Sequence, residues 1–298
     1  MMKRLLAIMG PTAVGKTAMA IKMAQWLGTE IVSFDSRQFY EELNIGVARP
    51  TEEELSAARH HFIACRSVRN PYNVSQYEDE ALVEVRQLFE SHDVVVAVGG
   101  SGLYLDALTD GMARMPDPSP ELRASLKEEI SKGGLEDMKK RLRDLDPEYY
   151  ERVDLCNPIR VQRALEVIIT TGRKYSEVVS QSVEPREFEV SRVALVAERE
   201  ELRERIDRRV DIMMDEGLEE EVISLKESRE LTPLNTVGYK ELFSYMDGGC
   251  SREEAVKRVK FHTWQYAKKQ QTWLNRYEGL TIVARDDEEG LKRVLAER

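Results

Sequence analysis

The sequence predicts an α/β fold in which helices flank a parallel sheet and an all-helical insertion interrupts the chain. Three observations support this prediction. Short apolar runs alternate with helical patterns in both outer parts of the chain. A glycine-rich pattern follows the first run. After the proline-rich segment 112–120 the pattern is helical throughout. We therefore expect a core domain of residues 1–112 and 191–298 and a helical insertion of residues 113–190.

Five short runs have the length and apolar content of strands, at residues 4–9, 30–35, 93–100, 191–197 and 280–284. The third of these runs, DVVVAVGG, is apolar enough for the middle of a parallel sheet. A helix is expected from near Lys16 to about Leu27. Two long helical stretches are expected at about 199–228 and 251–276.

Composition excludes several classes of protein. The net charge of −10 argues against an indiscriminate nucleic-acid binder, although the stretch from Arg252 to Arg276 is locally basic. No window approaches the roughly 18 apolar residues of a membrane span, so we expect no membrane partner. The three cysteines, Cys65, Cys156 and Cys250, form no CxxC pair, which fits a reducing cytoplasm without disulfides. No apolar surface stripe is visible, and we expect a monomer.

The stretch GPTAVGKT matches the G-x-x-x-x-G-K-T phosphate loop in full, between an apolar run and a helix. It predicts a P-loop NTPase-like core, and by motif alone nucleotide (ATP) binding. Backbone N–H groups and the Lys16 ammonium would hold the phosphates, while Thr17 offers a hydroxyl to Mg²⁺. The predicted phosphate-binding residues are Gly10, Pro11, Thr12, Ala13, Val14, Gly15, Lys16 and Thr17.

The next predicted strands lack the residues that an ATPase or GTPase needs. An ATPase or GTPase needs a carboxylate at the end of a second apolar strand to hold magnesium. The run VVVAV ends instead in Gly99, Gly100 and Ser101, and the N-K-x-D guanine motif is missing. Asp35, which ends EIVSFD, is the remaining candidate. It could be a magnesium ligand or a proton acceptor facing a second substrate, and the local pattern does not decide between them.

Other candidate residues have structural alternatives of similar weight. Ser36 and Gln38 follow Asp35 at the edge of a sheet where α/β proteins bind ligands, or they cap a loop. Ser101 begins another helix, either as a donor or as a simple cap. Aromatic residues alternate with basic ones in HTWQYAKKQQTWLNRY (262–277), which suits RNA stacking or a helix core. The adjacent histidines at 60–61 do not favour a metal pair.

Nine motifs together resemble the tRNA dimethylallyltransferases, the bacterial tRNA isopentenyltransferase family. They run in that family's order from Gly10 to Leu274 and include GPTAVGKT, SFDSRQFY, GVARP, HHFI, VGGSGLYLDAL, NPIRVQRALEV, RERIDRRVDIMM.EGLEEEV, TVGYKE and AKKQQTWL. The resemblance implies transfer of a dimethylallyl group from dimethylallyl diphosphate to N6 of the adenosine 3′ of the tRNA anticodon, with release of diphosphate. It implies Mg²⁺ as cofactor and the tRNA anticodon stem-loop as partner.

The resemblance also implies roles for individual residues. Asp35 would accept the proton of the amine, Ser101 would stand beside the departing oxygen, and Lys16 and Thr17 would keep their loop roles as catalytic groups. Arg199 and Arg205 would steady the diphosphate. The implied tRNA contacts are Asp35, Ser36, Arg37, Gln38, Ser101, Arg123, Ile159, Arg160, Val161, Gln162, Arg163, the 235–240 loop with Gly238, Tyr239 and Lys240, and Lys268 and Lys269.

The sequence departs from the family pattern at a few positions. Arg49 stands in GVARP, where the family usually has GTAKP, while Trp264 and Lys269 replace common arginines. Lysine cannot reproduce the bidentate and stacking contacts of a guanidinium.

Two other functions explain part of the pattern. A P-loop kinase of a small metabolite shares the first two motifs but would not need the helical insertion. A nucleotide-gated RNA-binding module explains the basic patches but leaves Asp35 and Ser101 unused.

Overall fold

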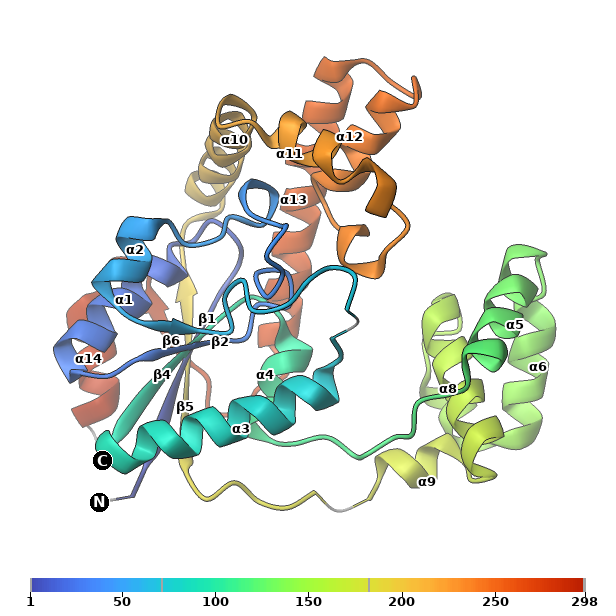
Figure 1. The fold of residues 1–298 in the computed structure, drawn as a ribbon. Coiled ribbons are helices and arrows are strands. Elements are labelled where there is room, and N and C mark those ends of the chain that lie inside the picture. The colour runs from blue at the N-terminus through green and yellow to red at the C-terminus, as the bar shows by residue number, and fades with distance from the viewer. Residues whose placement is uncertain (1, 71, 182, 297–298) are drawn as a thin grey trace. The chain divides into compact units, whose positions relative to one another are not determined.

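In the computed structural model, which describes residues 2–70, 72–181 and 183–296, the described strands form one parallel sheet. The strands are β1 (Arg4–Met9), β2 (Ile31–Ser33), β3 (His60–His61), β4 (Val94–Val98), β5 (Glu189–Val196) and β6 (Thr281–Ala284). Their order is β3-β2-β4-β1-β5-β6 (Figure 1). Each of the five predicted strands is present, whereas β3 was not predicted. All described pairings are parallel, including Ala7 opposite Ala97 in the central pair β1 and β4.

The central strand β1 divides the core between the two faces of the sheet. Leu5 and Ala7 belong to one buried cluster, and Leu6 and Ile8 belong to the other, as the twofold alternation of a strand requires. Helices α3 (Val74–Ser91) and α4 (Gly102–Thr109) pack in the first cluster. Helices α1 (Lys16–Leu27), α10 (Arg199–Asp215) and α14 (Glu288–Ala296) pack in the second. Figure 1 shows α1 and α14 on one side of the strands and α3 on the other.

The chain divides into two compact units, Met1–Thr109 with Arg186–Arg298, and Asp110–Pro185. These boundaries lie within a few residues of the predicted ones. The second unit is entirely helical in its described residues, with α5 (Pro120–Ser131), α6 (Leu135–Leu145), α7 (Pro147–Arg152), α8 (Pro158–Thr171) and α9 (Tyr175–Val179). It has its own apolar core, which includes Leu126, Met138, Leu142 and Leu165.

Sequence signals explain where α8 begins and ends. The Asn157 side-chain oxygen accepts hydrogen bonds from the N–H groups of Ile159 (3.1 Å) and Arg160 (3.3 Å) in the first turn of the helix. Pro158 occupies the first helical position, where its missing N–H costs nothing. Gly172 ends the helix with a φ of 66°, a conformation that glycine adopts without strain.

The predicted helical stretch 199–228 is interrupted, because α10 ends at Asp215 and α11 (Leu218–Ser224) begins after Gly217, whose φ is 101°. Helix α2 (Glu52–Ala57), helix α12 (Tyr239–Met246) and the 3₁₀ turns η1 (Ile45–Val47), η2 (Lys226–Ser228) and η3 (Thr232–Leu234) complete the loops of the first unit. Helix α13 (Arg252–Leu274) contributes to both clusters of the sheet domain. Among the described residues, none of the helices has the length and apolar content that crossing a membrane requires.

One carboxylate of the acidic stretch in α11 holds two loops together. The Glu221 side chain accepts hydrogen bonds from the N–H groups of Asn44 (3.2 Å), Ile45 (2.7 Å) and Gly46 (3.1 Å) at the start of η1. It also accepts the Tyr239 hydroxyl at 2.5 Å. Such charge-assisted bonds are the stronger ones in proteins. The η1 turn is therefore fixed against α11 and α12.

Candidate active site

The phosphate loop lies between β1 and α1, as the motif predicts. Gly10 has a φ of 144°, and a Cβ atom there would lie 2.7 Å from the carbonyl oxygen of Leu195, so no other residue fits without movement. Gly15 has a φ of 106° and directly precedes the first residue of α1. The unpaired backbone N–H groups in the first turn of α1 therefore point toward the phosphate loop. Such N–H groups attract anions.

Lys16 belongs to the same loop, and its ammonium donates to the carbonyl oxygens of Gly10 (3.0 Å) and Pro11 (2.9 Å). Burial lowers the pKa of Lys16 from 10.5 to about 8, opposed by the negative charge of Asp35 and assisted by the positive charge of Arg209. A negatively charged ligand at this position would therefore stabilise the protonated amine.

Two arginines of α10 reach the loop. Arg205 donates through Nε to the carbonyl oxygen of Ala13 at 2.7 Å, and Arg209 lies 3.4 Å from the hydroxyl of Thr12. Burial lowers the pKa of both guanidinium groups, and the positive charge of a neighbouring arginine lowers it further. Positive charge is thus concentrated around the loop.

Arg199 has a different place from the one that the family resemblance implies. It is exposed at the first position of α10, and its guanidinium carbon lies 5.9 Å from the ring centroid of Trp264. It does not line the cavities at the loop, whereas Arg205 and Arg209 do. Of the arginines on α10, Arg205 and Arg209 line these cavities, and the role that the resemblance implies for Arg199 stays a prediction.

Asp35 and Ser101 come together at the carboxyl ends of the neighbouring strands β2 and β4. Asp35 accepts a hydrogen bond from the N–H of Arg37 at 3.1 Å. The Ser101 hydroxyl accepts from the N–H of Ser36 at 3.0 Å and lies 2.9 Å from the Ser36 hydroxyl. A Cβ atom at Gly100 would lie 3.2 Å from one Asp35 oxygen, so glycine lets the carboxylate approach the second strand.

Gln270 of α13 connects these two halves of the site. Its side-chain oxygen accepts the N–H of Thr12 at 2.7 Å, and its amide nitrogen donates to the carbonyl oxygen of Gly100 at 3.0 Å. Gln270 was not predicted as a site residue, although the motif AKKQQTWL contains it. Tyr266, one turn earlier, points its hydroxyl toward the same site, where burial and the charge of Asp35 raise the pKa of that hydroxyl.

Two cavities meet at the loop. One has a volume of about 1110 Å³ and extends past Thr17 and Arg205 toward His60. The other has a volume of about 440 Å³ and extends toward the loop at 235–240 and α13. Lys16 and Asp35 line both cavities. Two ligands could therefore meet beside these two side chains from different directions.

Some of the other predicted residues of the sheet domain line the second cavity, and others lie outside it. The second cavity is lined by Arg37, Gly238 and Lys240, but not by Lys268 or Lys269, which are exposed on α13. Gln38 donates its amide to the carbonyl oxygens of Val47 (3.2 Å) and Ala48 (2.8 Å), which supports the wall of the cavity.

Two of the residues predicted to contact RNA have buried side chains. Val161 and Tyr239 are both 0% exposed, because Val161 packs in the core of the helical unit and Tyr239 packs against the η1 turn. Arg123, Ile159, Arg160, Gln162 and Arg163 lie in the helical unit with at least partly exposed side chains.

The fold and the loop define a P-loop-like α/β protein with two cavities beside the loop. The chain belongs to the IPP transferase family, whose model matches residues 38–277. It is 45% identical over 272 residues to the tRNA dimethylallyltransferase of Christiangramia forsetii, with 91% of this chain and 90% of the relative covered. For the enzyme of the same name from Flavobacterium johnsoniae the identity is 44% over 283 residues, with 93% and 92% covered. The solved full-length tRNA isopentenylpyrophosphate transferase from Bacillus halodurans is 31% identical, with a TM-score of 0.70 and 99% and 95% of the chains covered.

Proposed function

We propose that this chain is a tRNA dimethylallyltransferase. It transfers a dimethylallyl group from dimethylallyl diphosphate to N6 of the adenosine 3′ of the tRNA anticodon and releases diphosphate. The observation that supports this most directly is the position of Asp35, which lines both cavities beside the phosphate loop. Membership of the IPP transferase family gives the same reaction.

The reaction is a displacement at the first carbon of the dimethylallyl chain. The N6 nitrogen forms the new C–N bond, the C–O bond to the diphosphate breaks, and its electron pair leaves on the diphosphate oxygen. An adenine amine is a weak nucleophile, so the reaction needs a positioned amine, an acceptor for its proton and stabilisation of the leaving charge. We assign proton acceptance to Asp35 and place the Ser101 hydroxyl beside the departing oxygen.

The leaving diphosphate would lie in the phosphate loop. Lys16, Arg205 and Arg209 surround the loop with positive charge, and each is held by a hydrogen bond to a loop atom. These groups are oriented before the ligand arrives, so little reorganisation is needed as charge develops on the diphosphate.

Mg²⁺ fits the donor set of this site as a partner of the diphosphate. Thr17 lines the larger cavity next to Lys16 and offers one hydroxyl oxygen. The described residues contain no group of three or more His, Cys, Asp or Glu side chains that could enclose a metal ion. Mg²⁺ commonly takes few protein ligands and several phosphate oxygens and waters, and it neutralises diphosphate charge when bound.

We place the target adenosine in the smaller cavity, between Asp35 and the loop at 235–240. The base must leave its stack in the anticodon loop, which costs a few kcal/mol. Contacts elsewhere on the RNA, from Arg123, Ile159, Arg160, Gln162 and Arg163, would offset that cost. The proposal includes a monomeric enzyme that acts in the cytoplasm.

One assay separates this function from its alternatives. The protein is incubated with unmodified tRNA, labelled dimethylallyl diphosphate and Mg²⁺, without ATP. Label in tRNA supports the transferase. A small-metabolite kinase would leave the tRNA unlabelled and would consume ATP when given an acceptor. The family relationships do not favour that alternative.

A further inference from the structure

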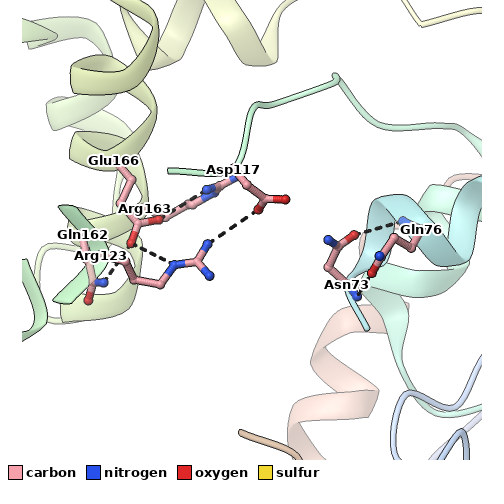
Figure 2. Close-up of polar contacts among 7 residues, drawn as sticks. All are labelled: Asn73, Gln76, Asp117, Arg123, Gln162, Arg163 and Glu166. Atoms are coloured by element: carbon pink, nitrogen blue, oxygen red, sulfur yellow. Dashed lines mark hydrogen bonds and ion pairs between the residues drawn. The ribbon is translucent and has the colours of Figure 1, made fainter. Parts of the chain in front are cut away.

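The helical unit contains a buried carboxylate among the side chains that we assign to RNA binding. Glu166 of α8 is 4% exposed. Its oxygens lie 2.9 Å from the amide nitrogen of Gln162, 3.3 Å from a guanidinium nitrogen of Arg163 and 3.7 Å from Nε of Arg123 (Figure 2). The first two partners lie one turn away on α8, and the third comes from α5. One acceptor group therefore organises three side chains from two helices.

The charge of Glu166 determines what Gln162 presents outward. An ionised carboxylate can only accept hydrogen bonds, so the Gln162 amide must turn its nitrogen toward Glu166. The amide oxygen is then left to accept a bond from another molecule. Arg123 and Arg163 instead present hydrogen-bond donors, because a guanidinium has five N–H donors and Glu166 accepts only some of them.

These arginines remain accessible while they are held. The side chains of Arg163 and Arg123 are 32% and 54% exposed, against 5% for Glu166. Arg123 is fixed on its other side as well, with a guanidinium nitrogen 3.6 Å from Asp117 (Figure 2). A planar guanidinium held at two points is pre-oriented for phosphate or for a base edge.

The negative charges of Glu166 and Asp117 balance the positive charges of the two arginines. Together these four side chains carry no net charge. Its contribution to RNA binding must then come from orientation more than from attraction. A buried ion pair is also weak support for stability, since apolar replacements are often as stable. Both points favour a role in recognition.

We propose that Glu166 is a positioning residue for RNA, which holds Gln162, Arg163 and Arg123 in the orientation that contacts the tRNA substrate. This inference rests on the proposed function, and Glu166 itself does not touch the RNA. Orientation and charge predict opposite results when the carboxylate is neutralised. Loss of orientation weakens tRNA binding, whereas simple removal of a negative charge strengthens it.

The test is Glu166→Gln, which keeps the shape of the side chain and removes its charge. The matched control is Glu177→Gln on α9, where an exposed carboxylate pairs with Arg173 at 4.0 Å. We expect the Kd and the KM for tRNA to rise about tenfold in Glu166→Gln, the size of one lost charge-assisted hydrogen bond. The kcat at saturating tRNA, the KM for dimethylallyl diphosphate and the values for Glu177→Gln should stay unchanged.

Unchanged or tighter tRNA binding by a folded Glu166→Gln overturns the positioning role. If that variant does not fold, Gln162→Ala decides the question, because this side chain is partly exposed. It should weaken tRNA binding about fivefold, and unchanged binding overturns the role. Failure of the unsubstituted protein to label tRNA overturns the proposed function as well, whereas an active wild type with an unaffected Glu166→Gln overturns this inference alone.

Discussion

The buried position of Lys16 predicts that affinity for dimethylallyl diphosphate depends on pH. In the free protein the pKa of Lys16 is lowered to about 8, chiefly by burial. The amine is then about nine-tenths protonated at pH 7 and about one-tenth protonated at pH 9. A bound diphosphate favours the protonated form, so above pH 8 binding must take up a proton and becomes weaker as pH rises.

The size of this effect follows from the same value. If the bound diphosphate restores the ordinary pKa of 10.5, the Kd rises by about 20-fold between pH 7.5 and pH 9.5. The terminal phosphate of the ligand, with a second pKa of about 6, is already ionised over this range and does not contribute. Isothermal titration calorimetry in buffers of different ionisation enthalpy, at constant Mg²⁺, measures both the Kd and the proton uptake.

Lys16→Arg is the control for this prediction, because an arginine stays protonated throughout the range. Its Kd should be nearly independent of pH. A wild-type Kd that is flat between pH 7.5 and 9.5 would refute the reasoning, and so would an equal slope in Lys16→Arg.

Three further substitutions test other parts of the site. Asp35→Ala should lower kcat about 10²-fold or more and leave tRNA binding largely intact, as measured by single-turnover transfer and filter binding; parallel loss of binding would make Asp35 structural. Arg209→Ala should raise the KM for dimethylallyl diphosphate about tenfold, whereas Arg199→Ala should leave it unchanged, and equal effects would contradict the assignment. Gln270→Leu removes the acceptor of the half-buried Thr12 N–H and a donor to the half-buried Gly100 carbonyl, so the free energy of unfolding should fall by about 1 to 3 kcal/mol, and a change below about 0.5 kcal/mol in denaturant titration would contradict the bridge.

Local signals were strong enough to predict the sheet. Apolar runs flanked by helical patterns correctly predicted β1, β4 and β5, and the phosphate-loop motif predicted where α1 begins. Strand β3 was missed because it contains only His60 and His61, and its pairing with β2 depends on tertiary context that two residues cannot signal.

The positions of site residues could be predicted where local motifs indicate them. They were less predictable where the residues come from segments that are distant in the sequence. Asp35 and Ser101 follow two strands whose ends become neighbours in a parallel sheet, so their proximity could be expected. Gln270 lies in α13, 258 residues after Thr12 in the sequence. No local pattern reveals a contact between segments so far apart. Val161 and Tyr239 also lie within the quoted motifs, but their side chains are buried. A residue of a motif can therefore serve packing.

The central claim is that the phosphate loop holds the leaving diphosphate of a prenyl transfer to tRNA. Its most direct test is to incubate the protein with unmodified tRNA, dimethylallyl diphosphate and Mg²⁺, without nucleotide, and to analyse the digested tRNA by mass spectrometry. The account predicts one dimethylallyl group on N6 of the adenosine 3′ of the anticodon, with one diphosphate released for each group transferred. An unmodified adenosine there, or modification that requires ATP, would contradict it.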